Sequence, residues 1–158
     1  MRRLRNKFKR PKAPWYLPRI EEERKIMKEY GLRRKREIWS AQEILRKFRR
    51  RARELNAVQN KAEEKILLDK LKRLGLLGGD ATLDDVLALT VYDILDRRLQ
   101  TILFKKALVN TPLEARQKIV HGHVLVNGRK VKFPSYLVKA DEENTIELLC
   151  KPSLFLIF

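Results

Sequence analysis

Apolar side chains recur at every third or fourth position through most of the first 120 residues, a period that predicts helices. The pattern predicts a short helix over 20–30, which Gly31 ends, and a longer helix over about 34–55. Five apolar residues should form one stripe along the longer helix: Ile38, Ala41, Leu45, Phe48 and Ala52. A third helix is expected over about 62–74, with Gly75 as its end. Its inward face should consist of Ile66, Leu67 and Leu71.

Pairs of polar side chains mark the starts of further helices. Thr82 with Asp85, and Thr90 with Asp93, have the spacing of a capping box, in which each side chain satisfies an amide at the helix start. The second of these boxes should open a helix that runs to about Lys106.

Another capping box combines Thr111 with Glu114. It places Pro112 at the first helical position, where the missing N–H of proline costs nothing. The helix that follows is expected to be short and to end at His121, before Gly122.

Beyond that helix the apolar period changes to two, which predicts strands. Val124 and Val126 should point to one face of a first strand. Asn127-Gly128 is the preferred sequence of a two-residue type I′ turn, because both residues tolerate positive φ, and Val131 continues the second strand.

Two more segments, 133–140 and 145–149, should add one or two strands, joined by the polar turn "DEEN". The order of elements therefore predicts an α+β protein. A helical domain comes first, and a compact helix–helix–hairpin–strand unit follows from about 90 to 150.

The net charge of the chain indicates what kind of partner it binds. The chain has 37 Lys and Arg against 20 Asp and Glu, a net charge of +17. Residues 1–53 hold 21 basic and 6 acidic side chains, so most of the excess lies there. Self-repulsion of this size favours a polyanionic partner, with nucleic acid first and an anionic membrane surface second. No run approaches the roughly 20 apolar residues of a membrane helix, so no membrane partner is expected.

The first 18 residues are read as an extended basic arm. Three prolines disfavour a helix there, and Trp15 with Tyr16 should act as an anchor. A disordered tail is the alternative reading. The cations expected to lie along phosphates are Arg2, Arg3, Arg5, Lys7, Lys9 and Arg10.

A second basic run, "RKFRRRARE", lies on the long helix. Its cations should point largely away from the apolar stripe. Such a run is usually a solvated face, but its density favours an anionic partner. The candidate contacts are Arg46, Arg49, Arg50 and Arg53.

Both histidines of the chain lie in "ARQKIVHGHVLVNGRKV", residues 115–131. No Ser or Cys nucleophile adjoins them, and Glu114 is committed to its cap, so no catalytic residue is expected. Two histidines and the single Cys150 make a poor zinc site, so neither metal nor cofactor is expected. A lone cysteine and a start without a secretion signal place the chain in the cytoplasm.

The same stretch suits binding better. Between Arg97 and Lys139 there are ten basic residues and one acid. The helix start at Thr111 and the hairpin should frame a concave basic surface, with Gly122 letting a ligand approach the backbone closely. Structured RNA, which is recognised through shape, phosphate and 2′-hydroxyl groups, fits such a surface. A solvated hairpin with ordinary turn chemistry is the alternative.

The segment "DRRLQTIL…NTPLEARQKIVHGHVLVNGRKVKFPSYLV" resembles the S-four RNA-binding domain over about sixty residues. The resemblance depends on Arg98, Leu99, Thr111 and the motifs "ARQ", "HGHVLVNG" and "PSY". It implies an RNA-facing set: Thr111, Arg116, Gln117, Gly122, His123, Asn127, Gly128 and Arg129, with Lys130 beside them on the hairpin. Pro112 stands where many of these domains carry a basic residue.

The N-terminal part resembles the small-subunit ribosomal protein S four family in its archaeal and eukaryotic form. The matching stretches are "RRLRNKFKRPKAPW", "IEEE", "YGLRRKREIW" and "DATLDDVLALTVYDILDRRLQTI". The resemblance covers about residues 1–150 and implies a primary protein of the small subunit that nucleates assembly of the 5′ domain of its rRNA. It also implies neighbouring ribosomal proteins, a place near the mRNA entry region and an influence on decoding accuracy.

Two other functions stay open from the sequence. The chain could be a free-standing factor that acts on ribosomes or tRNA. It could be a fragment of an RNA-modifying enzyme, although residues 1–90 show no recognisable catalytic site. The expected organisation is a basic arm over 1–18, a helical rRNA-binding domain over 19–90, an S-four domain over 91–150 and an apolar tail over 151–158.

Overall fold

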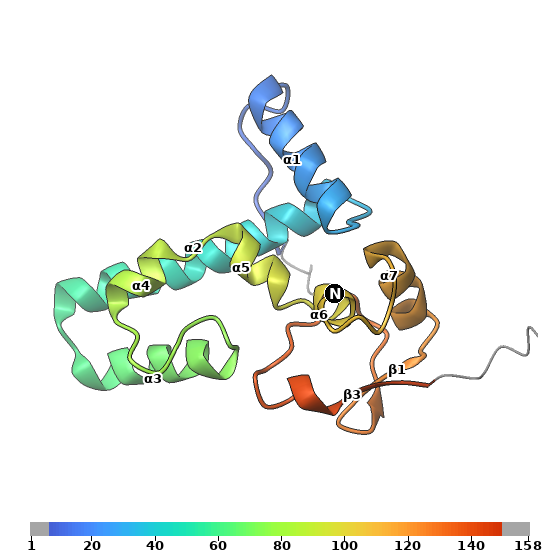
Figure 1. The fold of residues 1–158 in the computed structure, drawn as a ribbon. Helices are drawn as coiled ribbons and strands as arrows, with labels where there is room; N and C mark the ends of the chain where they lie inside the picture. The colour runs from blue at the N-terminus through green and yellow to red at the C-terminus, as the bar shows by residue number, and fades with distance from the viewer. Residues whose placement is uncertain (1–6, 150–158) are drawn as a thin grey trace, which may run out of the picture.

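The structure is a computed structural model that describes residues 7–149 (Figure 1). Arg2, Arg3, Arg5, Cys150 and the tail over 151–158 lie outside the described residues. Seven α-helices, a 3-10 helix and a small antiparallel sheet follow one another in the described part, which confirms the α+β class. The helices are α1 Leu17–Glu29, α2 Lys35–Val58, α3 Lys61–Arg73, α4 Leu83–Ala88, α5 Val91–Asp96, α6 Leu99–Lys105 and α7 Pro112–Val120. The remaining elements are β1 Val124–Val126, β2 Arg129–Lys130, the 3-10 helix Glu143–Thr145 and β3 Ile146–Leu148.

The long helix α2 organises the first lobe, which we define as residues 7–96. Helices α1, α3, α4 and α5 all pack against it (Figure 1). The predicted apolar stripe is confirmed, because four of its five residues are buried and Phe48 is half-buried. On α3, Leu67 and Leu71 are buried as expected, but Ile66 is 69% exposed, so its inward placement was wrong. Neighbouring helix positions differ by about 100°, and the pair one turn apart already fills the contact.

The first lobe has its own apolar core. Its fully buried residues include Ile38, Leu71, Val86, Ile94 and Leu95. The predicted capping boxes Thr82 with Asp85 and Thr90 with Asp93 are both present and start α4 and α5.

The helix expected over residues 90–106 is interrupted. Arg98 has an extended backbone, with φ −74° and ψ 141°, and forms an isolated bridge with Leu137. The amide of Leu99 donates to the Tyr136 carbonyl at 2.8 Å, and the amide of Val138 donates to the Arg97 carbonyl at 3.0 Å. The segment over 133–140 therefore makes this single bridge rather than the strand expected there. The interruption falls where the chain leaves one core and enters another.

The second lobe, residues 97–149, contains α6, α7 and a three-stranded sheet in the order β2-β1-β3. Both neighbours of β1 are antiparallel to it. Ala115 and Ile119 of α7 pack against Val124 and Val126 of β1 in a separate core. The Asn127-Gly128 turn is confirmed, with φ of 50° and 73°, and joins paired Val126 and Arg129. The strand expected over 145–149 is β3, which the 3-10 helix precedes.

The arm is held by a residue that the sequence reading did not single out. Trp15 and Tyr16 are 86% and 59% exposed, so they do not anchor the arm to the rest of the chain. Phe8 does, with its ring centroid 5.8 Å from that of Trp39. None of the helices within residues 7–149 is both long enough and apolar enough to span a membrane.

Candidate nucleic-acid interface

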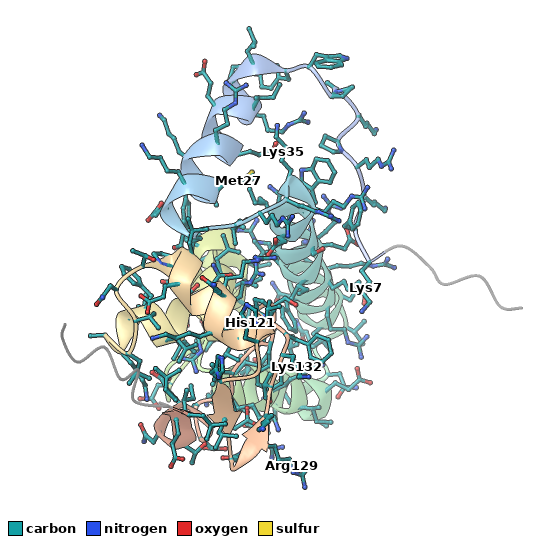
Figure 2. All side chains as sticks on the ribbon, turned by 90° about the vertical axis from the view of Figure 1, so that its right-hand side faces the viewer. Lys7, Met27, Lys35, His121, Arg129 and Lys132 are labelled. Carbon is teal, nitrogen blue, oxygen red and sulfur yellow. The ribbon has the colours of Figure 1, made fainter. Side chains whose placement is uncertain are left out.

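The hairpin and the C-terminal end of α7 lie along one side of the molecule (Figure 2). Thr111, whose hydroxyl accepts from the Glu114 amide at 3.1 Å, starts α7, and His121 ends it. Figure 2 shows His121, Lys132 and Arg129 following one another along the side of the molecule that includes the hairpin. The expected RNA-facing residues that are exposed are Thr111, Gln117, His123, Asn127, Gly128, Arg129 and Lys130.

Charge on this face is concentrated at the hairpin. Lys118 on α7 pairs with Glu114 at 2.8 Å, so that charge is offset within the helix. By contrast, Arg129, Lys130 and Lys132 are exposed and make no ion pair with a carboxylate of residues 7–149. Lys132 was not among the predicted contacts, although its place directly after the second strand could have indicated it. These three cations are available to an anionic ligand.

Gly122 plays a different part from the one expected. Its φ of +77° requires glycine, and it is buried rather than open to a ligand. A Cβ at this position would lie 3.3 Å from Cε of Lys132. The glycine therefore lets the lysine stem cover the end of α7, and the lysine rather than bare backbone faces outward.

The two histidine rings are neighbours, with centroids 6.2 Å apart and planes at 29° to each other. Within residues 7–149, no group of three or more His, Cys, Asp or Glu side chains is placed to hold a metal ion. Exposed stacked rings and the neighbouring Asn127 can contact RNA bases or sugars. The Asn127 side chain also accepts from the Thr145 hydroxyl, which ties the turn to the 3-10 helix.

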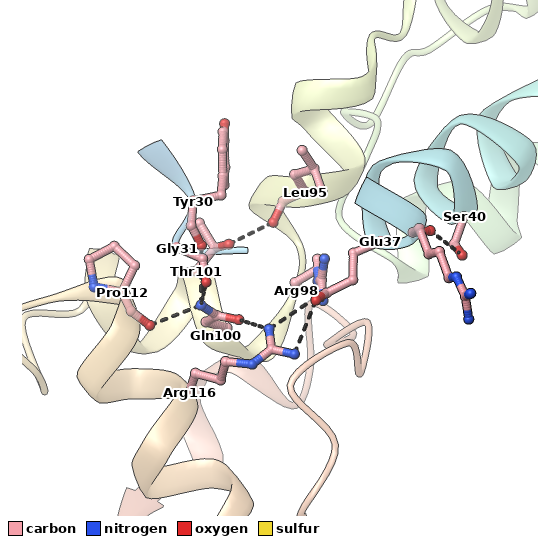
Figure 3. Close-up of polar contacts among 11 residues, drawn as sticks. Tyr30, Gly31, Glu37, Ser40, Leu95, Arg98, Gln100, Thr101, Pro112 and Arg116 are labelled. Atoms are coloured by element: carbon pink, nitrogen blue, oxygen red, sulfur yellow. Dashed lines mark hydrogen bonds and ion pairs between the residues drawn. The ribbon is translucent and has the colours of Figure 1, made fainter. Parts of the chain in front are cut away.

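Arg116, expected to point toward RNA, instead connects the two lobes (Figure 3). Its guanidinium donates to both carboxylate oxygens of Glu37 on α2, at 3.0 and 3.1 Å. Arg98, only 4% exposed, donates to the same carboxylate at 2.5 Å. The assignment of Arg116 to the free surface was therefore wrong. Sequence reasoning missed the partner because Glu37 is 79 residues away along the chain.

Gln100 completes this connection. It is 1% exposed, and its Nε2 lies 2.9–3.1 Å from the carbonyl oxygens of Tyr30, Gly31 and Pro112. Its Oε1 accepts from Arg116 at 3.4 Å. A buried amide bound to both lobes fixes their orientation through directional bonds.

Burial on its own would raise the pKa of Glu37, but hydrogen bonds from Arg116 and Arg98 outweigh burial and hold that pKa below its ordinary value. The carboxylate therefore stays ionised at neutral pH. Its negative charge offsets two arginines that would otherwise be partly buried without a partner.

The expected cations of α2 are partly engaged with the protein itself. Arg46 pairs with Glu43 at 2.6 Å, and Arg50 pairs with Glu54 at 2.9 Å. Half-buried Arg49 donates to a backbone carbonyl of the first lobe, so it has a structural role as well. Exposed pairs of this kind contribute little stability, so an RNA phosphate can replace the carboxylate as partner. In the described part of the arm the exposed cations are Lys7, Lys9, Arg10 and Lys12, the last of which was not among the predicted contacts.

Comparison with known proteins agrees with this geometry. The family described as S4 domain matches residues 97–144, which lie within the second lobe. Small ribosomal subunit protein uS4 of Ignicoccus hospitalis is 52% identical over 148 residues, covering 92% of this chain and 89% of that protein. The uS4 protein of Nanoarchaeum equitans is 52% identical over 94% of this chain and 86% of its own length, and that of Saccharolobus islandicus is 50% identical over 92% and 83%. The chain therefore belongs to the small ribosomal subunit protein uS4 family.

Proposed function

We propose that this chain is a structural, non-enzymatic constituent of the small ribosomal subunit and binds small-subunit rRNA. The observation that carries the proposal is an identity of about half, sustained over 92% of the chain, with proteins named for that subunit. The charge arrangement supports it, because exposed cations lie on the hairpin, along α2 and on the arm. The expected location is the cytoplasm, within the subunit.

A finer role follows from the family resemblance. The chain acts as a primary rRNA-binding protein, nucleates assembly of the 5′ domain and contacts neighbouring small-subunit proteins. It also contributes to the mRNA entry region and to translational accuracy. Two lobes held at a fixed angle by the Glu37 connection suit this role, since they can bind two parts of a folded RNA at once.

The mechanism is electrostatic and geometric. Lysine and arginine side chains displace counterions from phosphates, which supplies affinity without sequence preference. The hairpin, tied to the 3-10 helix through Asn127, sets the register on a folded RNA together with Thr111, Gln117 and His123. None of these steps requires a metal or a cofactor.

Binding to a 5′-domain transcript of small-subunit rRNA, measured across salt concentrations, tests the proposal. Each phosphate contact adds about 0.7–0.9 to the slope of log affinity against log salt, so several contacts should give a steep fall. A nearly flat dependence would contradict the mechanism. Sedimentation distinguishes a subunit constituent from a free-standing factor. A constituent stays with washed subunits at moderate salt in one copy per subunit, whereas a factor is substoichiometric and washes off.

A further inference from the structure

The arm and the first two helices line a cavity that is open to solvent. The arm is fastened at two points, by the contact of Phe8 with Trp39 and by a bond from Nη2 of Arg19 to the Pro14 carbonyl at 3.0 Å. Between these points a cavity of about 920 Å³ separates the arm from α1 and α2. Figure 2 shows Lys35 in this region, between α1 and the arm. The volume is at the upper end of the range of ligand pockets.

The lining of the cavity is strongly positive. It contains a single carboxylate, Glu23, which is 2% exposed. That carboxylate accepts from Nε1 of Trp39 at 2.9 Å and lies 3.4 Å from Arg19 and 3.2 Å from Lys35, so its charge is already offset. Six cations against one acid leave a surplus of five positive charges. The six are Arg10, Lys12, Arg19, Arg34, Lys35 and Arg36.

The N-terminal end of α2 forms part of the same wall. Arg34 is the N-cap of this 24-residue helix and provides no side-chain hydrogen bond to the first amides. The positive end of the helix dipole therefore points toward the cavity region, together with the cations of the first turn. The acid of that turn, Glu37, is engaged by arginines of the second lobe. Helix starts of this kind bind phosphate.

One aromatic side chain lies within the positive lining, and two more directly follow Pro14 of the arm. Trp39 lines the cavity, while Trp15 and Tyr16 stand exposed where the arm turns into α1. An acidic peptide would use the cations but leave these rings without a partner. Unpaired bases stack on exposed aromatic rings, and their backbone supplies the phosphates. A duplex offers phosphates only, because its bases are already stacked on one another.

We propose that this cavity binds an unpaired stretch of RNA, with a phosphate against the start of α2 and the lining cations. A neighbouring base stacks on Trp15 or Tyr16. The site is separate from the hairpin face. This proposal rests on the proposed function in one respect, namely that the partner of the chain is RNA. It names the kind of RNA that the arm region takes: a single strand next to the helical part of the fold.

The chain offers a direct readout in its two tryptophans, because Trp39 lines the cavity and exposed Trp15 directly follows Pro14, which also lines it. The full chain is titrated with a six-nucleotide oligouridylate while tryptophan fluorescence is followed. We expect saturable quenching that weakens with salt. The variant Lys12→Gln with Arg34→Gln should bind at least about tenfold more weakly, since two phosphate contacts are lost. Trp15→Leu should weaken binding by roughly fivefold or more through lost stacking.

The matched control removes two exposed lysines of α1 and α3, Lys25→Gln with Lys65→Gln, which do not line the cavity. It has the same net charge as the cavity variant and should retain affinity within about threefold, because only long-range attraction changes. Lys12→Gln alone, on the arm, replaces the double variant if that variant does not fold.

Three results would overturn the proposal: no quenching by the oligonucleotide, equal losses in the cavity and control variants, or equal quenching by a duplex of the same length. If the chain binds the 5′-domain transcript but gives any of these three results, the cavity site is refuted and the proposed function is not. Failure to bind that transcript, with quenching by the oligonucleotide intact, would refute the proposed function and keep the site.

Discussion

The two lobes present positive charge in different ways. In the first lobe cations are numerous, and many of those on α2 are offset by carboxylates one turn away, as with Arg50 and Glu54. In the second lobe fewer cations are exposed, but the hairpin holds Arg129 and Lys130 side by side without an acidic partner among residues 7–149. The first lobe thus favours general attraction to a polyanion, and the second favours a defined contact geometry.

The interactions within each lobe differ in kind from those between the lobes. Each lobe has an apolar core: the buried residues of the first end at Leu95 and those of the second begin at Leu99, while half-buried Leu137 of the second lobe packs against the first core. Between the cores the prominent connection is polar, through Glu37, Arg116 and Gln100. Apolar packing tolerates sliding, whereas directional bonds fix an angle. Stability and lobe orientation should therefore respond to different substitutions.

Removal of core side chains should give the largest effect. Leu71→Ala in the first core and Leu103→Ala in the second each remove a fully buried side chain and leave a cavity, at a cost of about 4 kcal/mol in unfolding free energy. Hydrogen exchange would locate the loss. Protection should fall mainly in the lobe that carries the substitution, and equal losses in both lobes would show that the two cores unfold as one.

Glu37→Ala should give the next largest effect, a loss of about 3 kcal/mol in unfolding free energy, because it leaves Arg98 and Arg116 partly buried without their carboxylate. Denaturant unfolding measures the loss. Glu54→Ala removes an acid from an exposed pair on the same helix and should have a much smaller effect. A loss for Glu37→Ala no larger than that of the control would show that the polar connection adds nothing to stability.

The same carboxylate should make stability depend on pH. The folded state holds the pKa of Glu37 below its ordinary value of 4.5, so its contribution is fully present above that pH. As pH falls below about 4.5 toward the lower folded pKa, the unfolded state binds the proton more readily, and the contribution is lost. Chemical unfolding of the wild-type chain and of Glu37→Gln across pH should give curves that converge in acid. Parallel curves would contradict this assignment.

Much of the fold was predictable where the information is local. The apolar stripe of the long helix, the capping box at Thr90 and the turn at Asn127-Gly128 depend on residues a few positions apart, and these three are confirmed. The interruption at Arg98 was not predictable, because it depends on a bridge to Leu137, distant along the chain. Apolar residues recur on both sides of the break because each side is buried in a core of its own. The sequence pattern therefore resembles that of one continuous helix.

The candidate site divides in the same way. Exposure of Arg129 and Lys130 follows from their place beside a tight turn, which the sequence indicates. The engagement of Arg116 does not, because its carboxylate partner is on another helix. The cavity under the arm escaped sequence reasoning for the same reason: Lys12 and Arg34 come together only because the arm folds back against α1 and α2.

A smaller effect is expected at the turn. Gly128 has φ +73°, and a Cβ there would meet nothing within 4 Å, so Gly128→Ala adds backbone strain alone. The cost should be about 1 kcal/mol in unfolding free energy, because the left-handed region disfavours Cβ. Gly79→Ala provides the control: it also meets open space, and its φ lies outside the left-handed region. Equal thermal melting of the two variants would contradict the strain argument.

The smallest effect on stability separates two arginines of the second lobe, Arg129 and Arg116. Arg129→Ala removes an exposed side chain and should change the unfolding free energy by less than about 0.5 kcal/mol. It should nevertheless weaken binding to the 5′-domain transcript several-fold and lower the salt slope by about 0.7–0.9, the value of one lost phosphate contact. Arg116→Ala should have the opposite pattern, with a clear loss of unfolding free energy and little change in RNA affinity, because it breaks a bidentate ion pair with Glu37. If both variants instead lose affinity without loss of stability, Arg116 exchanges its carboxylate for phosphate on binding, and the connection between the lobes is itself part of the RNA surface.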